Sequence, residues 1–479
     1  MKKRYILLNI GIAAVMMSGL LTGCTGVATG TGTKTDSEVV TESQTDNDEN
    51  AQDGKDASDD NSNDEADSKN ASESELFTDR DLEQEADLSD AENIELKSGE
   101  DVTIDSEGVY VITGDATGVT IYVEAEDEDK VQLVLDGASI ENESAPAIYL
   151  KSADKVFVTT TDSENSLTVT GEFEADGDTN LDAVIFSKDD LTINGTGTLN
   201  ITSSDNAVSC KDTLKITGST LNVDCEGNAF EAHDAIDIAD GNIKVTGCND
   251  GLHAEDSDDD SIGEINIVGG TIDITAVDDA IHGTTTVTVD GGTFTLNAAE
   301  CIEATVVEIN GGDINIEASD DGINAANKSS TLSPCFTMND GTLVIKMGAG
   351  DTDGIDSNGD IIVNGGTIDI TGQSTFDYDG KAEYNGGTII ENGEETNTIS
   401  NQFGGMGPGG GQGFGPGGDF QPGENGNPPE GDSNFRPGRG GQGGDMQPHD
   451  GGERGGQGGF PGGQPGDKNG GEQGTTEGE

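Results

Sequence analysis

The stretch INIVGGTIDI at residues 265–274 decides the fold of this chain. In it, isoleucines alternate with other residues on both sides of a glycine pair. Because successive side chains of a strand point to opposite faces, the isoleucines point inward, and Asn266 and Asp273 point outward. Gly269 and Gly270 mark a sharp corner, where a positive φ is needed. The stretch therefore predicts two short strands that meet at a corner.

The same pattern recurs along the middle of the chain. The copies, each with glycine before an alternating strand, are VGGTIDI at Val268, DGGTFTL at Asp290, NGGDINI at Asn310, NDGTLVI at Asn339, NGGTIDI at Asn364 and NGGTII at Asn385, with looser copies at Asn194, Thr217 and Asp240. The second glycines of three successive copies, Gly270, Gly292 and Gly312, are separated by 22 and 20 residues. This period, with two short strands per repeat, is typical of a solenoid whose repeats bury their apolar faces by stacking.

The solenoid class follows from what the repeats contain. Leucine-rich repeats share the period, but they require a leucine and asparagine signature and helical segments that are missing here. We therefore predict an all-β fold, a right-handed parallel β-helix. Weaker copies reach back to Val131, so we expect roughly ten coils and about 50 Å of axis at ~4.8 Å per coil. The segment from Ile94 to Lys130 is expected to start and cap the helix, because an uncapped end is an aggregation edge.

Each repeat also carries two polar positions that are separated by three residues, as in VDDAIH and SDDGIN. The first position is occupied in successive repeats by Asp205 and Asn206, Asn228, Asn249 and Asp250, Asp278 and Asp279, Glu300, Asp320 and Asp321, and Asp351 and Asp353. The second position is occupied by Ser209, Glu231, His253, His282, Glu303, Asn324 and Asp356. Because equivalent positions of successive coils stack, these side chains are expected to form two ladders.

The acidic ladders predict a metal site. Like charges at this spacing repel or raise carboxylate pKa values, and a bound cation removes the problem. Calcium accepts six to eight oxygen ligands in tolerant geometry, which suits a ladder better than the octahedral demands of magnesium. The predicted Ca²⁺ ligands are Asp250, Asp278, Asp279, Glu300, Glu303, Asp320, Asp321, Asp353 and Asp356. The alternative is structural, because Asp and Asn at turns cap backbone groups.

Two acidic insertions, at residues 256–260 and 351–360, favour the calcium interpretation. The second insertion is no EF-hand, because it lacks the glycine at the sixth place and the glutamate at the twelfth. His253 and His282 occupy equivalent places one coil apart. Two stacked imidazoles can hold a transition metal, but the carboxylate-rich setting without a cysteine favours turn-side hydrogen bonding.

The six cysteines are used in more than one way. Cys225 and Cys248 lie at similar places in consecutive repeats, so that either a disulfide between coils or two buried thiols is possible. Cys24 ends the sequence Leu-Thr-Gly-Cys after a basic start and an apolar run, which resembles the lipobox of bacterial lipoproteins. A signal peptide at residues 1–23 and a diacylated Cys24 are therefore predicted, and they place the protein on the outer side of the cell membrane.

Composition divides the rest of the chain. Residues 24–92 are predicted to be a disordered acidic linker, 93–392 the β-helix, and 393–479 a disordered tail rich in Gly, Pro and Gln. Lys plus Arg is 22 and Asp plus Glu is 95, a formal net charge of −73 that excludes unassisted binding to nucleic acid or to anionic lipid. Without tryptophan, a flat aromatic platform for sugar rings is not expected.

Four features together resemble the clostridial carbohydrate-binding domain family of secreted β-helix proteins. They are the lipobox, the opening GVYVITG and LVLDGASI, the repeated GGTIDI and DDAIH, and the Gly-rich tail. The resemblance extends over roughly Ile94 to Asn392. It implies a fold similar to polysaccharide lyases, calcium binding, and binding of plant cell-wall polymers such as polygalacturonate and cellulose. Neutral cellulose is harder to explain for this chain, because it has no tryptophan.

Three functions remain open at this point. The favoured one is a non-catalytic surface protein that holds acidic polysaccharide through calcium bridges. The second is a lyase resembling pectate lyases, whose base takes the proton next to the uronate carboxylate. No Arg occurs between Arg80 and Arg436, so that base would be one of Lys211, Lys244, Lys328 and Lys346. The third is an adhesin or spacer without sugar specificity.

Overall fold

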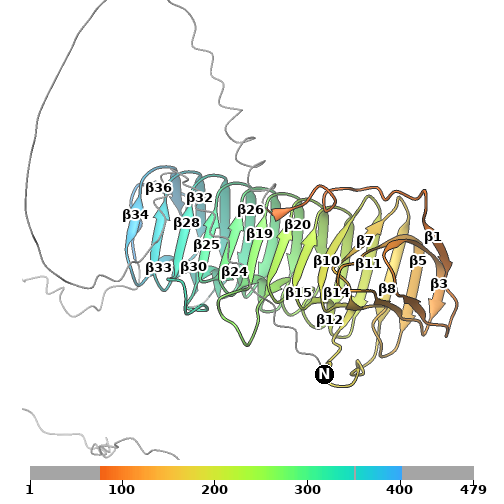
Figure 1. Ribbon diagram of the computed structural model, residues 1–479. Helices are drawn as coiled ribbons and strands as arrows, with labels where there is room; N and C mark the ends of the chain where they lie inside the picture. The colour runs from red at the N-terminus through yellow and green to blue at the C-terminus, as the bar shows by residue number, and fades with distance from the viewer. Residues whose placement is uncertain (1–75, 350–351, 402–479) are drawn as a thin grey trace, which may run out of the picture. The chain divides into compact units, whose positions relative to one another are not determined.

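The computed structural model describes residues 76–349 and 352–401, and these residues form a parallel β-helix of the predicted class (Figure 1). Successive coils stack along one axis, from β1 (Glu92–Glu95) at one end to β36 (Glu394–Thr396) at the other. Within the described ranges no helix is long and apolar enough to cross a membrane. The predictions for Cys24, for residues 24–75 and for the tail after residue 401 concern residues outside this part of the chain.

Each coil supplies strands to two sheets. The 24-stranded sheet contains β1, β3 (Gly108–Thr117), β5 (Lys130–Asn142), β7 (Lys155–Thr160), β8 (Glu164–Val169), β10 (Asp190–Gly195), β11 (Thr198–Ser203), β13 (Thr213–Ile216), β14 (Thr220–Cys225), β16 (Ala235–Ile238), β17 (Asn242–Val245), β19 (Glu264–Ile267), β20 (Thr271–Thr275), β22 (Thr286–Val289), β23 (Thr293–Ala298), β25 (Val306–Ile309), β26 (Asp313–Ala318), β28 (Cys335–Met338), β29 (Thr342–Met347), β31 (Asp360–Val363), β32 (Thr367–Thr371), β34 (Ala382–Tyr384), β35 (Thr388–Glu391) and β36.

The second sheet has 12 strands. They are β2 (Val102–Ile104), β4 (Ile121–Glu124), β6 (Ile148–Ser152), β9 (Ala183–Ser187), β12 (Asn206–Cys210), β15 (Phe230–Ala232), β18 (Leu252–Ala254), β21 (Asp279–Gly283), β24 (Glu300–Ala304), β27 (Asp321–Ala325), β30 (Asp353–Ser357) and β33 (Ser374–Tyr378). The sequence predicted two strands per repeat, but the polar segment of each repeat adds this third strand. It was missed because a polar residue at each end of the segment hides the apolar residues between them.

The pairing of strands shows how the helix ends. Every pairing between the named strands is parallel except one, because β36 turns back and pairs antiparallel with β35. β36 thus covers part of the sheet edge that β35, in the last coil, would otherwise leave open. At the other end, β1 pairs in register with β3. The β-helix therefore begins at β1, which precedes β2 in the chain.

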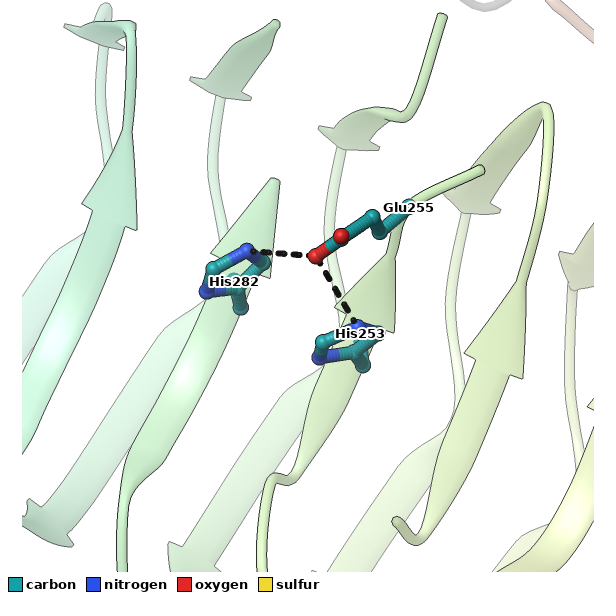
Figure 2. Close-up of side chains that lie close together, drawn as sticks. All are labelled: His253, Glu255 and His282. Carbon is teal, nitrogen blue, oxygen red and sulfur yellow. Dashed lines mark ion pairs between the residues drawn. The ribbon is translucent and has the colours of Figure 1, made fainter. Parts of the chain in front are cut away.

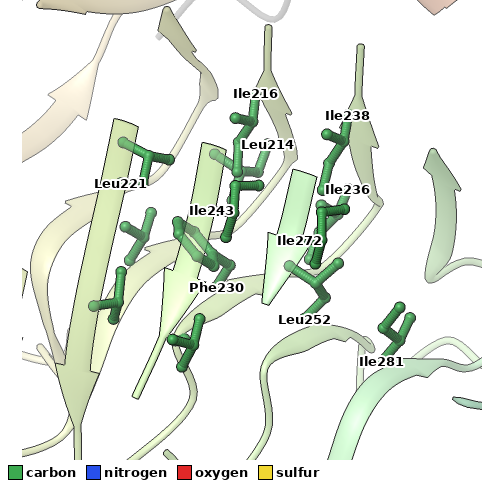
Figure 3. Packing of buried hydrophobic residues seen from close by; sticks show 14 of the residues in the cluster. Leu214, Ile216, Leu221, Phe230, Ile236, Ile238, Ile243, Leu252, Ile272 and Ile281 are labelled. Carbon is green, nitrogen blue, oxygen red and sulfur yellow. The ribbon is translucent and has the colours of Figure 1, made fainter. Parts of the chain in front are cut away.

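The core follows the predicted alternation. Ile265, Ile267, Ile272 and Ile274 are at most 1% exposed, whereas the polar residues between them remain partly exposed. Equivalent apolar residues stack from coil to coil, as Leu221, Ile243 and Ile272 do in β14, β17 and β20 (Figure 3). The predicted inward direction of the isoleucines is therefore confirmed.

Glycine forms the corners as the sequence predicted. Gly270, Gly292 and Gly312 have φ values of 98°, 106° and 92°, in the region that side chains with a Cβ rarely adopt. A Cβ atom on Gly270 would also lie 3.1 Å from the carbonyl oxygen of Gly241, the corner residue of the preceding coil. The corners therefore stack as closely as the strands do.

Of the two alternatives for Cys225 and Cys248, a disulfide or two buried thiols, the structure shows the second. Cys225 and Cys248 are buried and free, so that no disulfide joins these two coils. Burial in the apolar core raises the pKa of both thiols. They act as small apolar residues of the core rather than as reactive groups.

A segment that precedes the coils, residues 76–88, packs against the 24-stranded sheet and is called the arm here. Phe77 is 5% exposed and Asp81 is fully buried. In Figure 1 the arm lies in the red-to-orange segment that runs along the coils toward β1. The sequence assigned these residues to the linker, because their composition is acidic and nothing in it signals a buried aspartate.

Asp81 anchors the arm through both carboxylate oxygens. Its Oδ1 lies 2.7 Å from Lys155 Nζ and accepts a hydrogen bond of 2.9 Å from Thr192 Oγ1. Its Oδ2 accepts a hydrogen bond of 2.9 Å from the backbone N–H of Thr78. Gln84 completes the contact by accepting a hydrogen bond of 3.0 Å from a backbone N–H of β10. The arm thus depends on one buried ion pair and its hydrogen bonds.

Replacing Asp81 should release the arm. An Asp81→Ala variant leaves Lys155 buried without its partner, a change that typically costs about 3–5 kcal/mol. Arg80, which stacks over the Phe157 ring at 4.5 Å, should then become accessible to trypsin. The measurement is the rate of cleavage after Arg80 under native conditions. The exposed Asp79→Ala variant is the control and should be cleaved as slowly as the original chain.

Acid should release the arm in the same way. Burial opposes ionisation of Asp81, but the hydrogen bond and charge of Lys155 outweigh it and lower the pKa of Asp81 from 3.8 to about 2. Its contribution is therefore present in full above pH 3.8 and is lost as the pH falls to about 2. Hydrogen exchange of the arm amides, compared with amides of β25, should show this loss. A transition of equal size in Asp81→Asn would contradict the assignment.

Candidate functional site

Two polar ladders run along the 12-stranded sheet. We call Asn206, Asn228, Asp250, Asp279, Glu300, Asp321 and Asp353 the first ladder, and Ser209, Glu231, His253, His282, Glu303, Asn324 and Asp356 the second ladder. Each member of the second ladder pairs in register with the next, from β12 to β30. The predicted stacking of these positions is therefore confirmed.

The first ladder has a structural role. Asp250 Oδ1 accepts a hydrogen bond of 3.0 Å from the backbone N–H of Asp279, one coil further along. Asp321 Oδ1 accepts one of 3.1 Å from the N–H of Asp353, and Asn228 Oδ1 accepts one of 3.2 Å from the N–H of Asp250. These side chains satisfy backbone donors at the strand starts, as the structural alternative supposed.

The remaining oxygens of two ladder aspartates orient the histidines. Asp250 Oδ2 lies 2.9 Å from His253 Nδ1, and Asp279 Oδ2 lies 2.7 Å from His282 Nδ1. The two imidazoles stack with ring centroids 4.7 Å apart and an interplanar angle of 12°. The histidines therefore do form the hydrogen bonds that the sequence favoured, although the partners lie within or just before the same strands rather than in turns.

One residue of the site was missed by the sequence reasoning. Glu255 follows β18, and its Oε2 lies 3.6 Å from His253 Nε2 and 3.5 Å from His282 Nε2 (Figure 2). It belongs to neither ladder, which is why the repeat pattern did not reveal it. The available signal was its spacing of two residues from His253, which places two strand residues on one face.

Glu303 is held ionised by two cationic groups. Its Oε2 lies 3.0 Å from His282 Nδ1 and 2.5 Å from Lys328 Nζ. Burial opposes ionisation of Glu303, but these two hydrogen bonds outweigh it and lower its pKa to about 2. Burial likewise favours neutral His282, but Asp279 and Glu303 outweigh it and raise the pKa of the imidazole to about 10.

Further along the ladders, burial and neighbouring acids govern the pKa values of Glu300, Asp321 and Asp356. We call Glu300, Asp321, Asp353 and Asp356 the carboxylate cluster. Burial, followed by the charges of neighbouring acids, raises the pKa of Glu300 to about 8 and that of Asp321 to about 7. Burial and the charges of Asp377 and Asp353 raise the pKa of Asp356 to about 6. The cluster therefore resists carrying its full negative charge near neutral pH.

Asn324 links the carboxylate cluster to Glu303 through hydrogen bonds. Its Nδ2 donates hydrogen bonds of 2.8 Å to Glu300 Oε2 and 3.0 Å to Glu303 Oε1. Its Oδ1 is buried and has no hydrogen-bond partner among the described residues. Its ladder neighbour in the next coil is Asp356, which in ionised form is also only an acceptor. A buried acceptor without a donor, stacked next to a carboxylate, is suited to a cation.

The other predicted ligands lie elsewhere. Asp278 and Asp320 are exposed and stand directly before Asp279 and Asp321 in the chain, so that only the second acid of each pair enters the ladder. The acidic insertion at 256–260 is a loop before β19, in which Asp260 accepts two hydrogen bonds from Ser330. Asp351 lies outside the described residues.

The same ladder position is aromatic in earlier coils. Tyr122, Tyr149 and Phe186 pair in register and precede Ser209. Tyr149 and Phe186 are each 1% exposed, and their rings meet edge to face at 5.6 Å. The Tyr149 and Phe186 rings are therefore covered by protein, whereas Tyr122 is partly exposed.

Glu300 and Glu303 should respond in opposite ways to the same substitution. The raised pKa of Glu300 means that the fold loses stability as the pH rises from 4.5 to about 8, so that Glu300→Gln should stabilise the metal-free chain, most strongly above pH 8. The lowered pKa of Glu303 means that its charge stabilises the fold at neutral pH, so that Glu303→Gln should cost about 3 kcal/mol. Chemical denaturation in the presence of chelator measures both, and equal effects would contradict this assignment.

Comparison with known proteins gives a family for this arrangement. Residues 98–349 and 299–402, together more than half of the chain, match the family model described as "Carbohydrate-binding domain-containing protein". A relative with the same description from Acetivibrio thermocellus is 35% identical over 125 residues, which are 25% of this chain and 44% of the relative. The chain thus matches less than half the length of that relative.

A solved structure is also similar. It is described as "Structure of the polysaccharide lyase-like protein from C. thermocellum, Gadolinium derivative". The match has 29% sequence identity, covers 47% of this chain and 94% of that chain, and has a TM-score of 0.41.

Proposed function

The chain belongs to the family of carbohydrate-binding domain-containing proteins, and from this premise we propose that it is a non-catalytic, calcium-dependent binding protein for acidic polysaccharides such as polygalacturonate. The observation that carries the proposal is the buried Oδ1 of Asn324, which has no hydrogen-bond partner and whose ladder neighbour is Asp356. A cation at this point would satisfy the Asn324 oxygen, for which the described residues supply no donor, and would offset the charge of Asp356.

Calcium fits the donor set best. Asn324, Asp321, Asp353 and Asp356 offer only oxygen atoms, the ligands that calcium takes in six- to eightfold coordination. The raised pKa values of Asp321 and Asp356 support a cation there, because a bound cation removes the repulsion that raises them. Glu300 lies at the edge of this group, linked to it through Asn324.

Calcium also explains how an acidic protein holds an acidic polymer. At a formal net charge of −73, the bare chain repels polyuronate. A calcium ion shared between the carboxylate cluster and a uronate carboxylate converts this repulsion into attraction. The 12-stranded sheet repeats the polar positions along its axis, so that an extended polymer can lie along it.

The candidate bases support a binding function over lyase chemistry. A lysine must be neutral to act as a general base. Burial lowers the pKa of Lys328, but the hydrogen bond and the charge of Glu303 outweigh burial and raise this pKa. Lys211 forms an ion pair of 2.9 Å with a ladder glutamate, and Lys346 forms one of 3.3 Å on β29 in the other sheet. Lys244 is exposed on β17, also in the other sheet.

We also propose that the protein is anchored outside the cell by lipid on Cys24. The lipobox sequence before Cys24 supports this, and two acyl chains give firm attachment where one alone is marginal. The acidic residues between Cys24 and the arm would then be the spacer between the membrane surface and the β-helix.

One assay tests the function. The full chain is incubated with polygalacturonate in calcium and then in chelator, while polymer retention and absorbance of an unsaturated product are recorded. Retention that requires calcium and yields no product is the expected result. Formation of product would assign lyase activity instead, and neither retention nor product would leave an adhesin or spacer.

The carboxylate cluster can be tested by the same retention assay. The double variant Asp321→Asn, Asp356→Asn should weaken calcium-dependent retention by ~10-fold or more, because ligand charge sets calcium affinity. The Asp369→Asn variant on β32 of the other sheet removes a charge without touching the cluster and should bind normally. Equal losses in both variants would show that net charge, not this cluster, controls binding.

A further inference from the structure

We propose that His253, Glu255 and His282 form a site for a first-row divalent transition metal ion, of which Zn²⁺ is the best fit. The ligand atoms are the two imidazole Nε2 atoms and one carboxylate oxygen, and they all lie within 4.8 Å of one another. The first residue of the carboxylate cluster, Glu300, lies one coil after His282. The two sites use different donor atoms, so that this proposal can be tested independently of the proposed calcium function.

The site is built across two successive coils. His253 in β18 and His282 in β21 are paired in register, which holds their rings in the parallel stack. Glu255 reaches both Nε2 atoms from the end of β18, at 3.6 Å and 3.5 Å (Figure 2). These distances are too long for hydrogen bonds of full strength, and a small inward movement places all three atoms around one ion.

The carboxylates behind the rings orient both imidazoles for a metal ion. Asp250 and Asp279 accept hydrogen bonds from the Nδ1 atoms of His253 and His282, so that each ring presents its Nε2 toward Glu255. A metal ion bound there takes the place of the proton that cationic His282 carries on Nε2. Metal-binding histidines are commonly oriented in this way, by a carboxylate that takes the proton of the other ring nitrogen. The first ladder therefore supplies outer support for the site.

A second observation points to a ligand at the same place. His282 is only 5% exposed, and its Nε2 is buried without a hydrogen-bond partner. Buried polar atoms are paired in the great majority of native structures, so that such an atom needs an explanation. An ion bound between His282, His253 and Glu255 provides one. The other close group, Asp279, His282 and Glu303, is already satisfied by hydrogen bonds and by Lys328.

The local charge also favours a cation. Asp250, Glu255, Asp279 and Glu303 lie against the two imidazoles, and Lys328 forms an ion pair with Glu303. Two imidazole nitrogens select zinc and similar ions over calcium, which prefers oxygen alone. Three protein ligands leave the fourth position of a tetrahedral zinc ion for water or an anionic group. The Glu255 side chain is 43% exposed, so that this position can be reached from solvent.

Cobalt absorbance provides the test. The full chain is stripped of metal with chelator, returned to buffer that contains calcium, and titrated with Co²⁺. The expected result is one equivalent of Co²⁺ with the visible d–d bands of a tetrahedral site, displaced by Zn²⁺ but not by added Ca²⁺. Absence of these bands, together with absence of Zn²⁺ binding in calorimetry, would overturn the proposal.

Two variants assign the ligands. Glu255→Gln removes the anionic ligand from an exposed position, so that the fold is retained. His282→Asn keeps an amide donor for Asp279 but has no atom at the place of Nε2. Each should weaken Zn²⁺ binding by more than the ~10–100-fold typical of an outer-sphere change.

The matched control is His233→Asn. His233 lies outside both ladders, with its Nδ1 3.7 Å from Asp256. This variant should bind Zn²⁺ as the original chain does. If Glu255→Gln and His282→Asn also bind Zn²⁺ unchanged, the ion is held elsewhere and the site is refuted.

Discussion

The parallel hydrogen-bonded stacking of coils is the constraint on which the rest of this structure depends. It places equivalent residues of successive coils about 4.8 Å apart, whatever their chemistry. For apolar residues the result is favourable, because Leu221, Ile243 and Ile272 bury one another in a continuous column. For charged residues the same spacing is costly, since a carboxylate in one coil meets a carboxylate in the next. The core and the site are thus two outcomes of one geometric rule.

The second ladder meets this cost in different ways along its length. Its early positions are aromatic or neutral, and Glu231 has Lys211 as its counterion. In the middle, the two stacked imidazoles donate hydrogen bonds to aspartates of the first ladder, and Lys328 balances Glu303. Beyond Asn324 the protein supplies no comparable counterion among the described residues, and the raised pKa of Asp356 records the consequence. This part of the ladder, for which the described residues supply no counterion, is the part best suited to bind a cation.

The sequence predicted the features that depend on the repeat. The period, the inward isoleucines, the corner glycines and the register of His253 with His282 all follow from spacing, because stacking converts spacing into contact. It could not tell which acid of a pair enters the ladder. The structure places Asp279 and Asp321 there and leaves Asp278 and Asp320 exposed, because β21 and β27 begin at the second acid of each pair.

Features outside the repeat were not predictable in this way. The buried pair of Asp81 and Lys155 joins the arm to a strand far along the chain, and no periodicity connects them. Glu255 lies at a place that other coils do not use for ligands. Both residues are acidic in a chain with many acidic residues, so that composition did not single them out. Their burial or position, rather than their type, gives them a role.

Donor chemistry separates the two parts of the ladder that are suited to cations. The carboxylate cluster offers oxygen atoms and one amide, a set that calcium tolerates in many geometries. The histidine pair offers two nitrogens whose direction is set by Asp250 and Asp279, a set that favours zinc. Because the same stack of coils holds both sets of donor atoms in place, the position of one set does not depend on an ion bound at the other. A repeat whose polar residues vary from coil to coil can therefore place sets of donor atoms with different chemistry side by side on one face.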